Sequence, residues 1–108
     1  MKRWEIVNRL IENFGYQDYL EIGQQKGQCF REINVPNKEG LDPKPKDSLG
    51  VSCKYHMTSD DFFENHAAGK NYDIIFIDGL HIREQALKDV QNSLLHLKEG
   101  GSIVLHDC

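Results

Sequence analysis

Two apolar strands separated by an amphipathic helix constrain the fold of this 108-residue chain more than any other feature. The run from Tyr72 to Ile77 is almost entirely apolar and rich in β-branched residues, which is typical of a strand buried on both faces. Apolar residues then recur at helical spacing over 82–97, and residues 102–106 form a second apolar strand. A strand, helix and strand in this order favour a parallel sheet with a right-handed crossover.

The earlier part of the chain shows the same alternation of helices and short strands. The predicted elements there are a helix over 3–13, a strand over 19–22, a helix over 26–33, weak strands over 40–41 and 54–57, and a helix that begins near Ser59 and ends before Gly69. Thr58 and Asp61 have the spacing of a capping box, which supports a helix start at that point. We therefore expect an α/β fold, a Rossmann-like and mostly parallel sheet with flanking helices, in which strand 19–22 lies between strands 40–41 and 72–77.

Length and charge limit the functions that such a chain can have. A mass of 12.5 kDa predicts a single domain over 1–108, with a core over 18–108 behind the first helix. The net charge of −4 argues against general binding to nucleic acid or to an anionic membrane. No apolar run approaches the ~20 residues of a membrane span, and no apolar segment follows the basic N-terminus as in a secretory signal. Three widely spaced cysteines favour reduced thiols and a cytoplasmic location.

Polar and acidic residues follow every predicted strand. Ligands of parallel α/β sheets bind beyond the carboxyl ends of the strands, so residues at these positions are candidates for a shared site. A solvated loop explains any one of them, but loop composition explains five strand ends together less well. The residues are Glu21, Gly23, Asp42, Ser59, Asp60, Asp78, His81, His106, Asp107 and Cys108.

The first of these positions resembles a nucleotide-binding turn. Gly23 and Gly27 flank a sharp passage from strand to helix, where glycine permits tight bending and close approach of a ligand. Asp42 follows about 20 residues later, where nucleotide-binding α/β folds place a carboxylate on the ribose. An ordinary tight turn and an Asp-Pro turn remain the alternatives. An NAD-dependent oxidoreductase fragment is a further alternative, although the three-glycine spacing of its fingerprint is incomplete here.

Several segments, in order, resemble class I S-adenosylmethionine-dependent methyltransferases. They also resemble the small group of these enzymes often found beside glycan and natural-product tailoring genes. The resemblance covers about 18–108, and its most specific part is the run from Tyr72 to His81 with the last strand. The segments are Leu20 to Gly27, Gly40 to Pro43, Thr58 to Phe63, Asp73 to His81 and Gly100 to Cys108.

The resemblance implies a role for each strand end. Glu21 and Gly23, with Gly27 in the same turn, would hold the methionine end of S-adenosylmethionine. Asp42 would bind the ribose hydroxyls, and Ser59 and Asp60 would flank the adenine. Asp78 would lie close to the sulfonium and the methyl acceptor.

Proton removal and metal binding stay open as roles for the last two strand ends. Metal-assisted relatives imply Mg²⁺ or Mn²⁺ on Asp78 and Asp107. His81 could complete that metal shell, act as the general base for an acceptor hydroxyl, or only hydrogen-bond the strand end. This chemistry favours O-methylation of a small molecule or a sugar, so the expected partner is a small-molecule or glycan acceptor.

The complete fold of this family carries two further strands and a helix beyond the last strand predicted here. We therefore expect a truncated fold whose outer strand, 102–106, has an exposed edge that favours homo-oligomers. Two alternatives to an active enzyme follow from such truncation. One is a module that binds S-adenosylmethionine without catalysis, and the other is a structural fragment that dimerises through the open edge.

Overall fold

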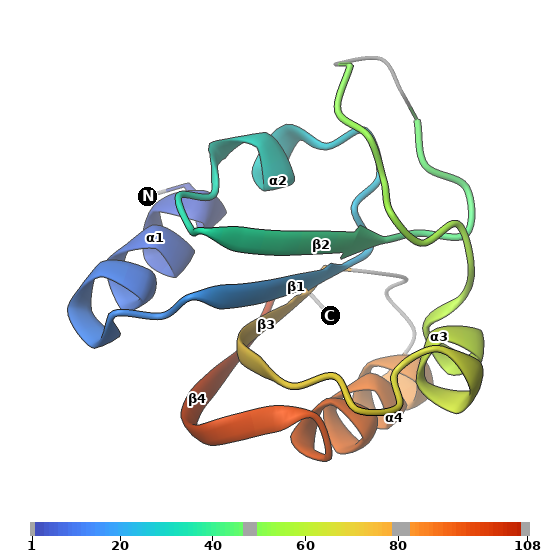
Figure 1. The fold of residues 1–108 in the computed structure, drawn as a ribbon. Helices are drawn as coiled ribbons and strands as arrows, with labels where there is room; N and C mark the ends of the chain where they lie inside the picture. The colour runs from blue at the N-terminus through green and yellow to red at the C-terminus, as the bar shows by residue number, and fades with distance from the viewer. Residues whose placement is uncertain (1, 47–49, 79–82, 107–108) are drawn as a thin grey trace.

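The computed structural model describes residues 2–46, 50–78 and 83–106, which form a parallel sheet with helices on both faces (Figure 1). The predicted α/β class is confirmed. The elements are α1 (Arg3–Phe14), β1 (Asp18–Ile22), α2 (Gln28–Glu32), β2 (Asn37–Leu41), α3 (Ser59–Asn65), β3 (Tyr72–Ile77), α4 (Arg83–Leu94) and β4 (Leu97–Leu105).

The strands are hydrogen-bonded in the order β2-β1-β3-β4, and all pairs are parallel. β1 lies between β2 and β3, with Leu20 opposite both Glu39 and Ile75. The prediction that the strand at Tyr19 is internal is therefore confirmed. Because all four strands run the same way, the ends of β1, β2 and β3 that carry Glu21, Asp42 and Asp78 meet at one edge.

Alternate side chains of the internal strands enter two separate apolar layers. Tyr19 and Phe76 pack with α1 and α2 on one face, and Leu20 and Ile75 pack with α3 on the other. Both faces of β1 and β3 are thus covered, as the continuous apolar pattern of residues 72–77 predicts.

The predicted strand over 54–57 is wrong. This segment meets the sheet only at an isolated bridge between Tyr55 and Leu41. β2 ends at Leu41, and the chain turns away at Asp42 and Pro43, so the neighbouring segment has no further backbone to pair with. The Tyr55 ring packs instead against Phe62 of α3, at a centroid distance of 4.8 Å.

β4 begins at Leu97, earlier than the predicted start at residue 102, and α4 ends at Leu94 rather than at residue 97. The register between β3 and β4 shifts between Tyr72 and Ile74, which lets the Gly100–Gly101 pair lie within the strand. A Cβ at Gly101 would stand 2.5 Å from the carbonyl oxygen of Asp73. The close approach of the two strands therefore requires glycine at position 101.

Within the described ranges, no helix combines the length and the apolar character needed to cross a membrane.

Candidate functional site

The turn between β1 and α2 bends tightly over the carboxyl end of β2. The amide of Gly23 donates a hydrogen bond of 2.8 Å to the carbonyl of Leu41. Gly23, Gln25 and Gly27 all have left-handed backbone, with φ of 90°, 53° and 85°. A Cβ at Gly27 would also lie 2.7 Å from the Cβ of Val51. The predicted glycine turn is thus a real constraint of the backbone.

Glu21 is an acid buried in the middle of the sheet, with 1% of its surface exposed. Burial raises the pKa of its carboxyl to about 7, although the hydrogen bonds from the Tyr19 hydroxyl and the Cys29 thiol favour the charged form. An acid with this pKa changes charge near neutral pH. Such perturbed groups are found most often where a protein binds a ligand or performs chemistry.

Glu21 shares a small cavity of about 30 Å³ with Asp78, which follows β3 and is 6% exposed. The cavity therefore brings together two carboxylates from adjacent strands, as the shared strand edge predicts. Its lining consists of Arg3, Glu21, Gln24, Gln25, Lys26, Gln28, Cys29 and Asp78.

Arg3, on the first turn of α1, lines this cavity and pairs with Asp78. Its Nε lies 3.3 Å from a carboxylate oxygen of Asp78. Our sequence reasoning missed this residue, because the basic N-terminus was weighed only as a secretion signal. The signal was present: Arg3 continues the four-residue spacing of Val7 and Ile11, the buried residues of α1.

Asp42 lies at the carboxyl end of β2 and fixes the glycine turn. Its two carboxylate oxygens accept hydrogen bonds of 2.7 Å from the amide of Gln25 and 2.8 Å from the amide of Lys44. The second bond is the local turn that Asp-Pro sequences favour. Asp42 therefore occupies the place expected of a ribose ligand and also holds the backbone beside that place.

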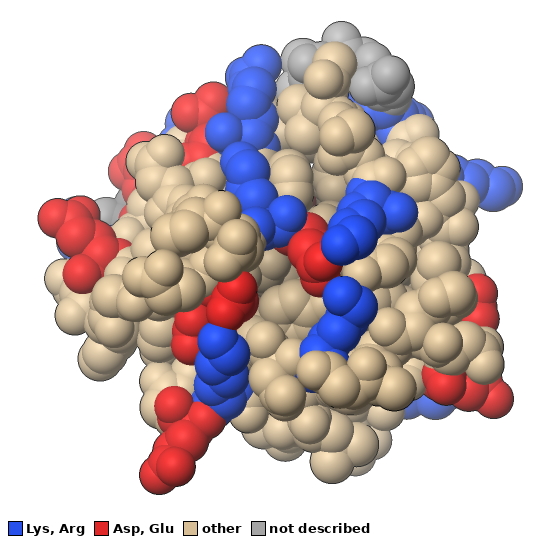
Figure 2. Space-filling model, in the orientation of Figure 1, with Lys and Arg blue, Asp and Glu red and all other residues tan. Residues whose placement is uncertain are grey.

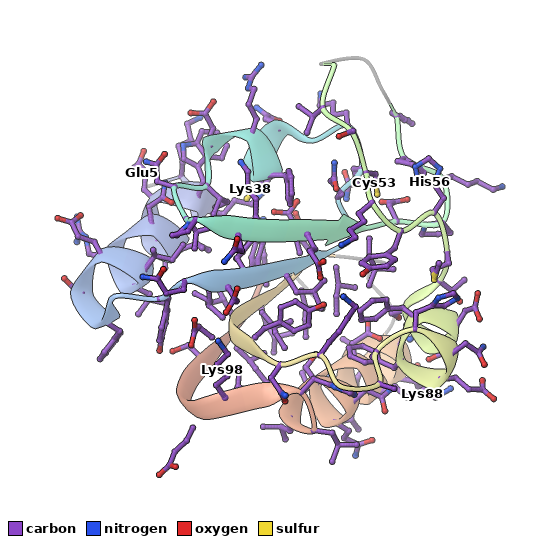
Figure 3. All side chains as sticks on the ribbon, in the orientation of Figure 1. Glu5, Lys38, Cys53, His56, Lys88 and Lys98 are labelled. Atoms are coloured by element: carbon purple, nitrogen blue, oxygen red, sulfur yellow. The ribbon has the colours of Figure 1, made fainter. Side chains whose placement is uncertain are left out.

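Ser59 and Asp60 begin α3, where Thr58 caps the helix by accepting a 3.1 Å hydrogen bond from the Asp61 amide. The predicted helix start is confirmed. The side chains of Ser59 and Asp60 face α4, where Ser59 donates to Asp89 over 2.5 Å and Lys88 pairs with Asp60 over 3.1 Å. Figure 3 shows Lys88 in this region.

Asp89 is a second buried acid that our sequence reasoning missed. It is 3% exposed, and burial raises the pKa of its carboxyl. Gln85 also donates to it, over 2.9 Å. The spacing of Ala86, Asp89 and Ser93, the buried residues of α4, was the available signal. Nothing joins this cluster to the Glu21 cavity among the contacts that the structure describes.

His81 and Asp107, with Cys108, lie outside the described residues. His106 is at the expected edge, because its amide donates to the carbonyl of Ile77 over 3.1 Å. In residues 2–46, 50–78 and 83–106, no group of three or more His, Cys, Asp or Glu side chains could hold a metal ion.

A larger hollow than the Glu21 cavity lies at the opposite edge of the sheet, by the amino ends of the strands. It has a volume of about 600 Å³, and Figure 2 shows basic side chains around an acidic one on this face. The acid Glu39 contacts Lys54 and Lys70 and accepts a hydrogen bond from the Tyr72 hydroxyl. Of the site residues assigned from the sequence that the structure describes, none lines this hollow.

Comparison with known proteins identifies the family. A family profile described as a methyltransferase domain matches residues 20–108 of this chain. A search of curated proteins finds no match. The profile covers β2, β3 and β4 in full, β1 from Leu20 onward, and the edge at which Glu21 and Asp78 meet. The chain therefore belongs to this family of methyltransferase domains, which are class I, S-adenosylmethionine-dependent enzymes.

Proposed function

We propose that the chain binds S-adenosylmethionine at the carboxyl edge of β1, β2 and β3 and promotes O-methylation of a small molecule or a sugar. The observation that carries this proposal is the pair of buried carboxylates, Glu21 and Asp78, in one cavity. A buried acid is stabilised by a positive partner, and S-adenosylmethionine carries an ammonium and a sulfonium.

The chemistry of the lining fits this cofactor, but the present shape of the cavity does not yet admit it. Pockets for ligands of similar size usually measure about 300–1,000 Å³, whereas this cavity measures about 30 Å³. Binding therefore requires side chains of the lining to move. The orphan Nε of Arg3, which is buried without a hydrogen-bond partner, is consistent with a lining that rearranges.

We assign the residues as follows. Glu21 binds the ammonium of the methionine end, and the turn at Gly23 and Gly27 lets the backbone approach it. Asp42 binds the ribose hydroxyls while it keeps the glycine turn in place. Ser59 and Asp60 flank the adenine from the start of α3.

The bound cofactor supplies a methyl group that is already activated by the positive sulfur. The protein must align the acceptor oxygen with that methyl group and exclude water, which is the proximity effect. It must also remove the proton of an acceptor hydroxyl. We propose that His81 removes this proton as the general base, while Asp78 orients the reacting groups.

A metal-assisted form of this mechanism uses Asp78 and Asp107 to bind Mg²⁺ or Mn²⁺, which would acidify the acceptor hydroxyl. The test is the melting temperature of the cofactor-bound protein with Mg²⁺, Mn²⁺ or chelator. A metal-dependent rise that Asp78→Asn abolishes would support the metal. A melting temperature unchanged by either ion would reject it and leave His81 as the sole proposed base.

We also propose self-association through β4. β4 is an edge strand of the described sheet, and its Leu105 is 52% exposed. An unpaired strand edge is a ready surface for pairing with a second copy. Light scattering that shows a monomer at all concentrations would contradict this. The free thiols of Cys29 and Cys53 support a reducing, cytoplasmic location.

The direct test of the proposed function is calorimetric titration with S-adenosylmethionine, with NAD as the competing candidate. We expect S-adenosylmethionine alone to bind. Asp42→Ala should weaken binding by about 1–3 kcal/mol, the size of a lost charge-assisted hydrogen bond. Asp61→Ala, an exposed residue of α3, is the control that should bind as the parent does. An affinity unchanged by Asp42→Ala would remove that residue from the site, and NAD binding alone would overturn the proposal.

A further inference from the structure

Arg3 stands in the cavity that the proposed function assigns to a positively charged cofactor. Among the residues that the structure describes, Arg3 lines the cavity with the buried carboxylates Glu21 and Asp78 and pairs with Asp78. We infer, on the basis of the proposed function, that Arg3 is a built-in competitor. Arg3 pairs with Asp78 in the ligand-free protein and must leave when S-adenosylmethionine binds. Arg3 therefore lowers the affinity for S-adenosylmethionine more than the affinity for the product, S-adenosylhomocysteine, whose sulfur is neutral.

The packing of α1 fixes the position of the Arg3 backbone. Val7 and Ile11 are buried on the same helical face. Asn8 ties α1 to the end of α2 and the chain just after it, because it donates to the carbonyl of Glu32 and accepts from the amide of Asn34, each over 2.8 Å. The helix is therefore held in place, and displacement of Arg3 requires a movement of its side chain rather than of α1.

The ion pair with Asp78 is suited to exchange. The charged atoms lie 3.3 Å apart, but the buried Nε of Arg3 makes no hydrogen bond. The side chain of Arg3 remains 29% exposed, whereas that of Asp78 is 9% exposed. The cation can therefore swing toward solvent, while the carboxylate stays in the cavity and gains from any cation that replaces it.

The guanidinium of Arg3 already lies beside an aromatic ring while it pairs with Asp78. The centre of the Arg3 guanidinium lies 5.9 Å from the centroid of the Trp4 ring. Contact with an aromatic face stabilises a guanidinium without a carboxylate partner. Trp4 would keep the released side chain near the mouth of the cavity, so Arg3 returns to Asp78 when the ligand leaves.

S-adenosylmethionine and S-adenosylhomocysteine differ in the charge on the sulfur atom. S-adenosylmethionine has a positive sulfur, whereas S-adenosylhomocysteine has a neutral sulfur and the same ammonium, carboxylate and nucleoside. Displacement of Arg3 opposes the binding of both ligands by its bulk. Only the positive sulfur competes with Arg3 for the charge of Asp78, so removal of Arg3 should favour the cofactor over the product.

The experiment is titration calorimetry of both ligands with the whole chain and with Arg3→Met, which keeps an unbranched apolar side chain. We expect S-adenosylmethionine to bind about tenfold more tightly to Arg3→Met, with a change for S-adenosylhomocysteine several-fold smaller, the usual range of coupling between two charged groups. Arg3→Lys keeps the charge and should retain most of the parent's preference. Arg9→Met, on the exposed face of the same helix, is the matched control and should change neither affinity.

Two patterns would overturn the inference while the proposed function stands. One is weaker binding of S-adenosylmethionine to Arg3→Met, which would make Arg3 a ligand of the cofactor. The other is an equal change for both ligands, which would mean that Arg3 acts by bulk alone. If neither ligand binds the parent, Arg3→Met or Arg9→Met while all three show the same cooperative melting, the proposed function and this inference both fail.

Discussion

The two ends of the sheet handle buried charge in opposite ways. At the amino end, Glu39 contacts Lys54 and Lys70 and accepts from Tyr72, and Lys98 pairs with Asp18. At the carboxyl end, Glu21 and Asp78 are far more deeply buried, and Arg3 pairs with Asp78 in the cavity that the two acids share. Figure 3 shows Lys38 and Lys98 toward the amino ends of the strands and Cys53 near the carboxyl end of β2.

The pKa values express the same difference. Burial would raise the pKa of Glu39, but hydrogen bonds from Lys54 and Tyr72 and the charge of Lys70 together lower it. Burial raises the pKa of Glu21 to about 7, because its own hydrogen bonds offset only part of the effect. The charge of Glu39 is thus stabilised by its partners, whereas burial dominates at Glu21. A deeply buried acid with a raised pKa, rather than cavity volume, marks the candidate site.

Replacement of Glu21 should have the largest effect on the free energy of unfolding. The pKa of Glu21 is 4.5 in the unfolded reference and about 7 in the folded protein, so the folded state holds a proton that the unfolded state releases. The free energy of unfolding should therefore fall as pH rises from about 4.5 to 7, by about 3 kcal/mol. Glu21→Gln should remove this decline and be more stable than the parent at pH 8, as urea unfolding would measure.

Glu39→Gln is the matched control at the other end of the sheet. The folded-state pKa of Glu39 is lowered, so its contribution to stability is present at neutral pH and lost as pH falls. This variant should therefore lose stability at neutral pH and keep the decline that Glu21 causes between pH 4.5 and 7. A parent whose stability does not change over that range would contradict the ionisation assigned to Glu21.

Two glycines with left-handed backbone allow a second comparison. Gly27 and Gly69 have φ of 85° and 77°, and a Cβ at Gly69 would meet nothing within 4 Å. Gly69→Ala should cost about 1 kcal/mol of backbone strain. Gly27→Ala adds a clash with Val51 and should cost about 3 kcal/mol. Denaturant unfolding measures the free energy of unfolding of the two variants. Equal losses would show that the Val51 side chain moves aside without cost.

The smallest effect should come from the exposed ion pairs at the amino end. Lys54 pairs with Glu39 but its side chain is 55% exposed. Lys54→Met should change the free energy of unfolding by about 0.5 kcal/mol, and less at high salt. Thermal melts in low and high salt test this. A loss as large as that of Gly27→Ala would mean that the two ends of the sheet do not differ as we describe.

The apolar pattern predicted the internal strands because both of their faces are covered. A continuous apolar run such as residues 72–77 is typical of a strand buried in this way. The pattern at 54–57 failed because pairing there depends on where β2 ends, and the Asp42–Pro43 turn removes the partner. The sequence of a segment does not specify whether its neighbour has backbone groups available for strand pairing. The start of β4 was missed for the same reason, since a register shift against β3 extends it.

The candidate site was predictable to the extent that it depends on strand ends. Glu21, Asp42 and Asp78 meet at one edge because parallel strands must end together. Arg3 was missed because it enters from a helix that precedes the sheet, and only its spacing with Val7 and Ile11 indicated the direction of its side chain. The partner of Ser59, Asp89, depends on how α3 and α4 pack, which no motif encodes.

The internal position of β1 has a consequence for the time course of folding. β1 is made early in the chain, but one of its two neighbours, β3, pairs Ile74 with Tyr19 only after a long intervening segment has been made. Tyr16, just before β1, likewise donates a hydrogen bond to Gly100. A nascent chain must therefore keep Tyr19 and Leu20 from aggregation until β3 emerges, and closure of that long loop should set the folding rate.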